Sequence, residues 1–362
     1  MKLIESSVQI IEEKDPYKMI ELAGRTCYKS ENNITEDSAK EFVDRMIKLG
    51  HGAILEHGTI YLTIAKTAMN IGDPIFYIRN KYSKVNEDDY FYYITTNMRV
   101  IVENNRLDDL QYQVKPTEHH EKRITAKFIC DRGVSHEFVR HRVFSFAQES
   151  QRYCNYSKDK FGNELTFIKP TWLDIPTGDY TYWDGDWCDI DNMKIQLPSD
   201  NGVADNFLWC LNNAGMQYRL LINKGLKPQE ARAVLPNATK TELVMTGFES
   251  DWEHFFSLRC SGAAHPDAKK LADELKSLMN VKNIELNSVI TINNVNKCIK
   301  GIADSENINV IVMQNDIVIF NESDEGKVLV KGIAGWCKGW ELSFTPKQFV
   351  EHFEIIGLTY TL

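Results

Sequence analysis

A cluster of basic side chains is the part of this sequence best suited to chemistry. Arginine, histidine and arginine stand at 140–142, and after seven residues serine, glutamine and arginine follow at 150–152. A guanidinium group offers a planar fork of donors that fits phosphate, while Ser150 and Gln148 can add neutral hydrogen bonds. The spacing therefore predicts an anion site. An alternative is that these basic side chains only offset the dipole at a helix C-terminus. Judged by charge alone, the two interpretations have about even odds.

Sequence patterns place this cluster after a strand and a short helix. Residues 124–130 alternate between apolar and more polar side chains, as on a strand, and 131–133 supply turn chemistry. Ser135 is the expected N-cap of the helix that follows. Apolar side chains at 134, 138 and 139 would share one face of that helix, and Glu137 and Arg140 would lie on another.

The residues before the cluster predict helices and strands in alternation. A strand is expected at 7–12, and a helix begins after Asp15 with proline at its first position. A second helix begins at Ser38, with Glu41 at capping-box spacing, and ends at Gly50. An alternating strand follows at 60–64. The stretch 68–117 holds two strand-like runs, FYYITT and MRVIVE, and no candidate catalytic residue.

The residues after the cluster begin with a long irregular loop at 154–202, whose aromatic side chains are expected to pack. A helix at about 203–224 stops at Gly225, and its inward face is expected to hold Val203, Phe207, Leu211 and Leu220. Pro228 opens a short helix. A further helix begins at Ser250, at capping-box spacing from Glu253, and another begins at Pro266.

These elements predict an α+β fold, with helices packed around a mainly antiparallel sheet, because the strands are not regularly interleaved with crossover helices. Residues 307–332 read as two or three short strands, and a helix is expected near 346–353. We therefore expect a catalytic domain at 1–280 and a small β-rich appendage at 281–362, in which 331–340 could form an exposed aromatic and basic patch.

Composition narrows the functional classes. With 362 residues, 43% hydrophobic and 26% charged, the chain reads as a soluble globular protein, and it holds no apolar run of about 20 residues and no secretory signal. We expect a cytoplasmic protein that binds no membrane. A net charge of −9 argues against bulk binding of nucleic acid. The eight cysteines form no C-x-x-C pair or zinc spacing, so no metal is expected, and no G-x-G-x-x-G or P-loop motif occurs.

Four stretches resemble the flavin-dependent thymidylate synthases, in the order expected for that family. The R-H-R, seven residues, then S pattern resembles the family signature, within ICDRGVSHEFVRHRVFSFAQESQRYCNYSKDKFGNELTF. HGAILEHG resembles the family's H-x-x-x-x-E-H element. EARAVLPNATKTELVMTGF and DWEHFFSLRCSGAAHPDAKKLA resemble its later segments. The resemblance covers roughly residues 1 to 280.

The resemblance implies a role for each matching residue. The substrate dUMP would be bound by Glu137, Arg140, Gln148, Glu149, Ser150, Gln151, Arg152, Arg232 and Arg259. The FAD cofactor would be bound by His51, Ala53, Glu56, Arg140, His141, Arg142, Gln148 and His254. Arg259 would touch the pyrimidine ring and is the catalytic candidate. The chain departs from the family at Ala53, often Ser or Thr, and at Phe248 and Ser250, where several members carry Asn and Arg against the flavin.

The resemblance also implies a reaction and its partners. The chain would methylate dUMP to dTMP, with methylenetetrahydrofolate as carbon donor and FAD reduced by NADPH as hydride carrier. The family builds its flavin site from several subunits, which implies a homotetramer with the H-x-x-x-x-E-H segment facing a neighbour. No P-C-H tripeptide is present to supply the cysteine nucleophile of the other thymidylate synthases.

Three alternatives stay open at the level of sequence. Ser150 could act as a nucleophile, although binding outweighs attack at about four to one because no base is evident to activate it. A regulatory protein could have kept the nucleotide pocket without turnover. A helix-turn protein could use the R-H-R cluster to bind nucleic acid, which predicts a colourless protein with strongly salt-dependent binding.

Overall fold

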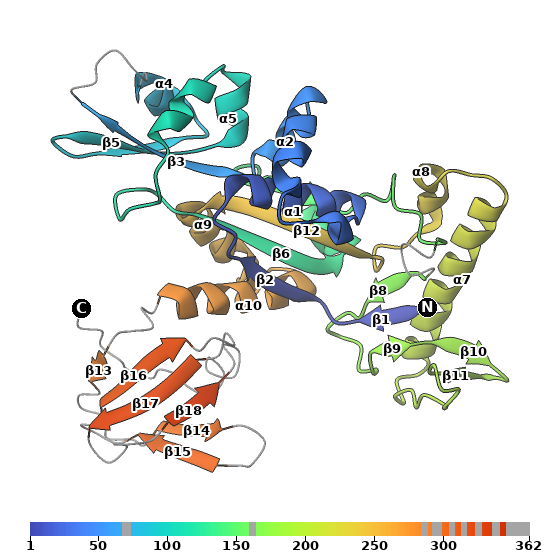
Figure 1. Ribbon diagram of the computed structural model, residues 1–362. Helices are drawn as coiled ribbons and strands as arrows, with labels where there is room; N and C mark the ends of the chain where they lie inside the picture. The colour runs from blue at the N-terminus through green and yellow to red at the C-terminus, as the bar shows by residue number, and fades with distance from the viewer. Residues whose placement is uncertain are drawn as a thin grey trace. The chain divides into compact units, whose positions relative to one another are not determined.

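The computed structural model describes residues 1–66, 74–158 and 164–283, together with the strands between Val289 and Phe344 (Figure 1). The chain forms two compact units, Met1–Ala272 and Asp273–Leu362. The fold is α+β, as the sequence predicted. Within the described residues, no helix is long and apolar enough to cross a membrane.

An antiparallel sheet forms the centre of the first unit. Its strand order is β2 (Ser7–Ile11), β6 (Arg123–Asp131), β12 (Lys240–Phe248) and β7 (Ser145–Gln148). β12 pairs along its whole length with β6, and its middle pairs with β7. This confirms the strand expected at 124–130. It also brings the end of the basic cluster beside a strand almost a hundred residues later in the chain.

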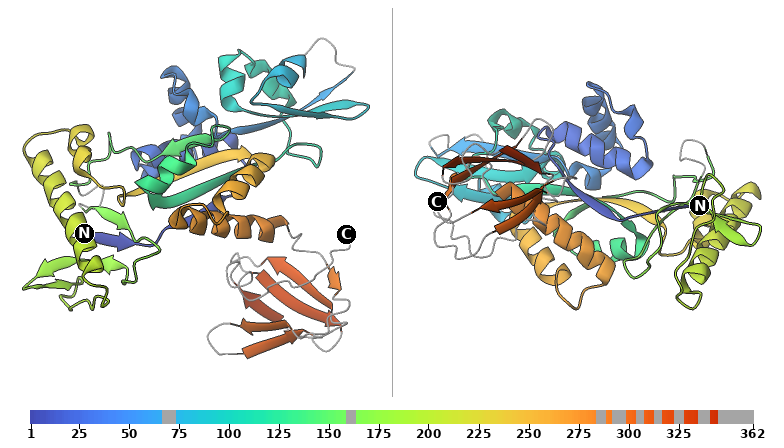
Figure 2. Two further views of the ribbon diagram at one scale, coloured as in Figure 1. Left: turned by 180° about the vertical axis from the view of Figure 1, so that it is seen from behind. Right: turned by 90° about the horizontal axis from the view of Figure 1, so that it is seen from below.

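Helices cover both faces of this sheet. Figures 1 and 2 show α1 (Pro16–Tyr28) and α2 (Ser38–Lys48) on one face, and the buried core there joins them to α3 (Gly52–Leu55) and to Val244 of β12. On the other face, the Phe128 ring lies 5.0 Å from Phe138 of α6 (Arg132–Phe138) and 6.4 Å from Phe255 of α9 (Glu249–Arg259). α10 (Pro266–Asn283) follows α9.

A second antiparallel sheet has the order β3 (Thr59–Ala65), β5 (Phe91–Asn97) and β4 (Lys84–Glu87). It adjoins α4 (Pro74–Arg79), α5 (Met98–Glu103) and the 3-10 segment Leu107–Tyr112. The strand expected for MRVIVE is wrong, because these residues form α5. The Asn97 side chain accepts a hydrogen bond from the Val100 amide at 3.1 Å and caps the helix, which the apolar run alone could not reveal.

Short strands interrupt the stretch that was expected to be one irregular loop. β8 (Thr166–Ile168) and β9 (Gly178–Asp179) flank β1 (Lys2–Ile4), while β10 (Thr181–Trp183) pairs with β11 (Asp186–Cys188). Their aromatic side chains pack against α7 (Val203–Asn223) as expected. The inward face predicted for α7 is wrong in part: Val203 and Leu220 are exposed, whereas Leu208, Leu211 and Tyr218 are buried.

Three predicted N-caps are wrong, each by a few residues. Ser38 binds Glu21, and Asp37 occupies the cap of α2. The Asp131 carboxylate caps α6 by accepting from the Val134 amide at 2.7 Å, while Ser135 donates to a carbonyl within the helix. For α9 it is Asp251 that accepts from the Phe248 amide, at 3.0 Å. The N-cap is therefore an aspartate in α2 and α6, whereas in α9 it is Phe248, whose amide is bound by Asp251 of the first turn.

The second unit is rich in strands. β13 (Val289–Thr291), β16 (Ile317–Glu322), β17 (Val328–Ala334) and β18 (Glu341–Phe344) form one antiparallel sheet, and β14 (Ile299–Ala303) pairs with β15 (Ile308–Val312). The strands expected in 307–332 are confirmed. The helix expected near 346–353 and most of the patch at 331–340 lie outside the described residues.

Candidate functional site

The basic cluster lies on the turn between α6 and β7. Hydrogen bonds from the His141 amide to the Phe138 carbonyl and from the Phe144 amide to the His141 carbonyl, both 3.1 Å, fix this turn. Arg140 and Arg142 are exposed, and neither forms an ion pair within the described residues. His141 points inward between them. The turn thus offers two guanidinium groups that pair with no carboxylate of the described residues.

His141 is buried beside Arg259. Its ring lies 5.0 Å from the Phe255 ring, and Arg259 Nε donates to His141 Nε2 at 3.0 Å. Burial, and next the positive charge of Arg259, lower the pKa of His141 to about 4. The imidazole is therefore neutral at neutral pH, and its Nε2 carries the lone pair that accepts this bond.

Glu137 completes the hold on Arg259. Nη1 of Arg259 contacts the Glu137 carboxylate, and Nη2 donates to the Glu137 carbonyl at 2.7 Å. A guanidinium has five N–H donors, so two remain after these three bonds. The sequence placed Glu137 near Arg140, but its ion partner is Arg259, which lies at the end of α9. His254, earlier on α9, is exposed, with its ring 6.3 Å from that of His141.

The chain after β7 forms a tight turn that carries the serine of the signature. The Ser150 amide donates to the Cys27 carbonyl at the end of α1 at 2.9 Å, and the Cys154 amide donates to the Ser150 carbonyl at 2.9 Å. Arg152 is exposed, and Gln151 is buried with no partner for its Nε2 atom. An orphaned buried donor next to an exposed arginine leaves hydrogen-bonding capacity for an anionic ligand.

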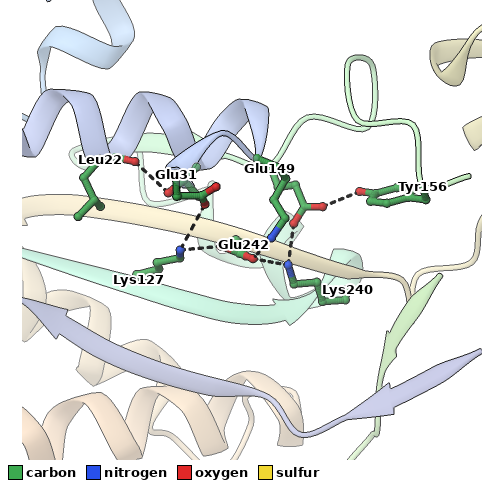
Figure 3. A network of polar contacts seen from close by, with 9 residues as sticks. Leu22, Glu31, Lys127, Glu149, Tyr156, Lys240 and Glu242 are labelled. Carbon is green, nitrogen blue, oxygen red and sulfur yellow. Dashed lines mark hydrogen bonds and ion pairs between the residues drawn. The ribbon is translucent and has the colours of Figure 1, made fainter. Parts of the chain in front are cut away.

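Gln148 and Glu149 point to opposite sides of the sheet. Gln148 Nε2 donates to Ser135 Oγ at 2.8 Å, which ties it to the helix that carries Glu137. The Glu149 carboxylate is buried, and it accepts from Tyr156 at 2.7 Å and from Lys240 at 2.9 Å (Figure 3). Sequence reasoning treated these neighbours as one set of ligands. The structure directs only Gln148 toward α6.

The H-x-x-x-x-E-H element forms α3 and its flanks, and α3 packs against β7. His51 and Ala53 are exposed, and Glu56 pairs with Arg99 at 2.6 Å. His57 is buried and its Nδ1 lies 2.8 Å from Thr246 Oγ1 of β12. Burial, and next the charge of Arg123, lower the pKa of His57 to about 3, so this histidine is neutral.

Arg232 follows α8 (Pro228–Ala231) in a 3-10 turn, Arg232–Val234, and is partly exposed. Arg132, at the start of α6, lies close enough for the two charges to interact. Burial lowers the pKa of Arg132 first, and Arg232 lowers it further, against the opposing effect of Tyr156. The distant arginine of the sequence is thus brought to the same end of the sheet as the start of α6.

Sequence reasoning missed two basic residues beside these elements. Lys84 of β4 lies with its Nζ 2.5 Å from Ser250 Oγ and 4.6 Å from the centre of the Phe248 ring. Arg123, at the start of β6, donates to the Glu56 carbonyl at 3.0 Å and to Ser145 at 3.3 Å. Neither residue stands in a recognisable motif. Their partners lie far away in the sequence and come close only in the folded chain.

The described side chains include no group of three or more His, Cys, Asp or Glu that could hold a metal ion. They do include cationic side chains that can bind anions: Arg140 and Arg142 before β7, Arg152 after it, and a partly exposed Arg232. They also include Arg259, whose direction is fixed by a carboxylate and a neutral imidazole. Such a set can bind a phosphorylated ligand and stabilise negative charge on it.

Comparison with known proteins gives consistent matches. The family model described as thymidylate synthase complementing protein matches residues 9–83 and 107–282. A flavin-dependent thymidylate synthase of Geobacter sulfurreducens is 28% identical over 148 residues, 41% of this chain and 52% of that protein. Another, from Corynebacterium aurimucosum, is 24% identical over 258 residues, 70% of this chain and 72% of that protein. The chain thus spans about half the length of the first relative.

Among solved structures, the chain is similar to a UMP/dUMP methylase, PolB from Streptomyces cacaoi, bound with 5-Br dUMP. The identity is 17%, the TM-score is 0.36, and the match covers 78% of this chain and 93% of that chain.

Proposed function

We propose that this chain, which belongs to the thymidylate synthase complementing protein family, is an enzyme that methylates dUMP to dTMP. Methylenetetrahydrofolate would donate the carbon, and FAD reduced by NADPH would carry the hydride. The observation that carries the proposal is the position of Arg259, held by Glu137 and neutral His141 of the R-H-R segment. No simple helix-end charge needs two such partners.

The phosphate of dUMP would lie against the exposed end of the turn after β7. Ser150 and Arg152 stand on that turn, and Gln151 has a donor without a partner. We assign Arg140 and Arg232 to the same ligand as further cations, in a chain whose net charge is −9. Because cationic donors are concentrated there, a nucleotide monophosphate would be held by charge-assisted hydrogen bonds. Both carboxylate oxygens of Glu149 already accept hydrogen bonds within the protein. Glu149 would therefore support dUMP binding by fixing the turn and not by contacting the phosphate.

Methylation of uracil requires electron density at a ring carbon. The two free N–H groups of Arg259 would donate to a ring oxygen and stabilise the anionic form of the base. Glu137 and His141 fix the direction of the guanidinium before the substrate arrives. His141 is neutral and so adds no competing charge. Gln148, tied to α6 through Ser135, would border the same space.

Several residues assigned to the flavin are exposed, and two of them are positively charged, which suits an anionic dinucleotide. Arg140 and Arg142 are exposed without an ion partner in the described chain, and His51, Ala53 and His254 are exposed. The cofactor when reduced supplies a hydride. Glu56 would act mainly as an anchor for Arg99, which its carboxylate already binds. His141 would support the site from beneath the turn.

Lys84 extends this proposal to a segment outside the family match, which omits residues 84–106. Its ammonium contacts Ser250 and the Phe248 ring, the two positions where the sequence departs from the family. We infer that Lys84 supplies from β4 a cation for the adenosine diphosphate end of the cofactor. Glu121, 3.7 Å away, partly balances its charge.

Assembly and location follow from the same family reading. We propose a cytoplasmic homotetramer, in which α3 faces a neighbouring subunit, and a catalytic domain at 1–280 followed by a module at 281–362. The module would be dispensable for chemistry because every recognised motif precedes it.

The test is turnover. Purified protein with dUMP, methylenetetrahydrofolate, FAD and NADPH should form dTMP, and omission of any one component should stop it. A yellow protein that forms no dTMP would instead be a regulatory nucleotide-binding protein. A colourless protein that binds polynucleotide in a salt-dependent way would support the nucleic-acid reading.

A further inference from the structure

We propose that a buried network of lysines and glutamates positions the substrate turn at 149–153, with Lys240 as its principal positioning residue. The network comprises Lys29, Lys127, Lys240, Glu149 and Glu242. Figure 3 labels all of these except Lys29. The inference rests on the proposed function, because it assigns the turn to dUMP. None of these lysines belongs to the set of binding residues above, and none touches the exposed arginines.

Glu242 of β12 is the centre of the network. It is buried, and its carboxylate contacts all three lysines: Lys29 and Lys240 on one oxygen, and Lys127 on the other at 2.6 Å. Although burial alone would raise its pKa, the three ammonium groups hold the pKa of Glu242 well below its usual range. The carboxylate is therefore charged at neutral pH.

Lys240 connects this centre to the substrate turn. Its Nζ contacts Glu242 and also donates to Glu149 at 2.9 Å. The other Glu149 oxygen accepts from Tyr156 at 2.7 Å, and the Glu149 amide donates to the Glu242 carbonyl at 2.8 Å. Glu149 is thus attached to β12 through both its main chain and its side chain. Ser150 comes directly after it.

Lys29 connects the same centre to α1. It is the C-cap residue of α1, in the left-handed conformation with φ 49°, and its Nζ contacts Glu242. Two residues earlier, the Cys27 carbonyl accepts from the Ser150 amide at 2.9 Å. The Tyr28 and Tyr153 rings lie 5.3 Å apart. The turn is therefore clamped between β12 on one side and the end of α1 on the other, and both clamps meet at Glu242.

An apolar cluster could fill this space and stabilise the fold equally well, since buried ion pairs often add little net stability. Ion pairs, however, fix direction and register. With Lys240 replaced by an apolar residue, the Glu149 carboxylate would remain buried without its cation and would have to move or take up a proton. Either change would shift Ser150, to which the proposed function assigns the phosphate of dUMP.

Lys127 provides a matched control. It contacts Glu242 in the same network, and its other ion partner within the described residues is Glu31 at 3.8 Å. It makes no contact with Glu149. Lys127→Met and Lys240→Met therefore remove the same charge from the same carboxylate, and only the second breaks the connection to the substrate turn.

Two measurements on the full chain test the proposal. Hydrogen exchange of the peptide that covers 149–154 should accelerate in Lys240→Met and stay near wild type in Lys127→Met, because the Ser150 and Cys154 amides lose their fixed partners. The dUMP dissociation constant, measured by titration calorimetry, should rise about tenfold to hundredfold in Lys240→Met only. FAD affinity should stay unchanged, and kcat should fall less than KM rises.

A double variant separates positioning from simple destabilisation. Lys240→Met/Glu149→Gln removes both charges, so no buried charge is left unpaired. If positioning matters, dUMP affinity stays weak in this variant; recovery of wild-type affinity would overturn the proposal. Equal effects of Lys127→Met and Lys240→Met on exchange and affinity would also overturn it, as would unchanged dUMP affinity in Lys240→Met. The wild-type protein could also form no dTMP while Lys240→Met still accelerates exchange only at the turn. That result would refute the proposed function and would support the positioning role of Lys240.

Discussion

Replacement of Arg259 by lysine separates a ring-contacting arginine from an ordinary helix-end charge. Lysine keeps the positive charge at the end of α9 and can keep one contact with the Glu137 carboxylate. It cannot at the same time reach His141 Nε2 and the Glu137 carbonyl, so about two hydrogen bonds are lost. At about 1 kcal/mol each, the variant should lose roughly 2 kcal/mol of unfolding free energy and melt a few degrees lower.

The loss of rate should be much larger than this loss of stability implies. Lysine has a point charge without the planar fork, and loss of one donor to a developing oxyanion typically costs about 100-fold or more in rate. We expect Arg259→Lys to fold, to bind FAD, and to form dTMP at about a hundredth of the wild-type rate under saturating dUMP. Rates come from chromatography of dTMP, folding from thermal melts, and FAD binding from absorbance.

Arg25→Lys is the matched control. Arg25 also lies in the last turn of a helix, donates twice to a glutamate, and is as shielded from solvent as Arg259, with side-chain exposures of 13% and 16%. Its variant should show a similar drop in melting temperature and near-normal turnover. If Arg259→Lys also turned over at near the wild-type rate, Arg259 would have to leave the catalytic list.

Further predictions concern acid stability, cofactor affinity and the second unit. The pKa of His57 is lowered to about 3, so the unfolded chain takes up a proton first as pH falls below about 6.5, and stability is lost progressively between those values. Urea unfolding should show about 2 kcal/mol of this loss between pH 6.5 and 5, and a smaller slope in His57→Asn, which keeps a polar group for Thr246 without titrating. Lys84→Met should raise the FAD dissociation constant about fivefold, or roughly 1 kcal/mol. Lys81 lies over the Tyr82 ring, and Lys81→Met should leave the FAD dissociation constant unchanged. Equal dissociation constants for the two variants would remove Lys84 from the site. Deletion of 285–362 should leave a soluble, flavin-binding, active protein, and a soluble, flavin-loaded but inactive product would show that part of the site was misplaced.

Sequence patterns predicted the strands at 7–12 and 124–130 and most helices because burial enforces periodicity, but no strand was predicted at β7 or β12. The alternation at 124–130 is confirmed in β6, where Ala126, Phe128 and Cys130 are buried. Predictions from these patterns were wrong where a single polar contact determines the type or the start of an element. The Asn97 cap turns MRVIVE into a helix, and Asp131 rather than Ser135 begins α6.

The candidate site shows the same division. Residue types and spacing pointed to the R-H-R turn and to Ser150, but not to their partners. Glu137 meets Arg259 across 122 positions, and Glu149 meets Lys240 across 91. Such pairs arise from the antiparallel register of β6, β12 and β7, which brings distant segments side by side and leaves no trace in local sequence.

An anaerobic single turnover tests the central claim most directly. Protein carrying FAD that has been reduced beforehand is mixed with dUMP and methylenetetrahydrofolate in the absence of NADPH, while flavin absorbance and dTMP are followed together. We predict that oxidised-flavin absorbance returns as dTMP forms, with roughly one dTMP for each reduced flavin, because the proposed reaction takes its hydride from the flavin and not from the folate. No dTMP, or dTMP formed while the flavin stays reduced, would contradict the account.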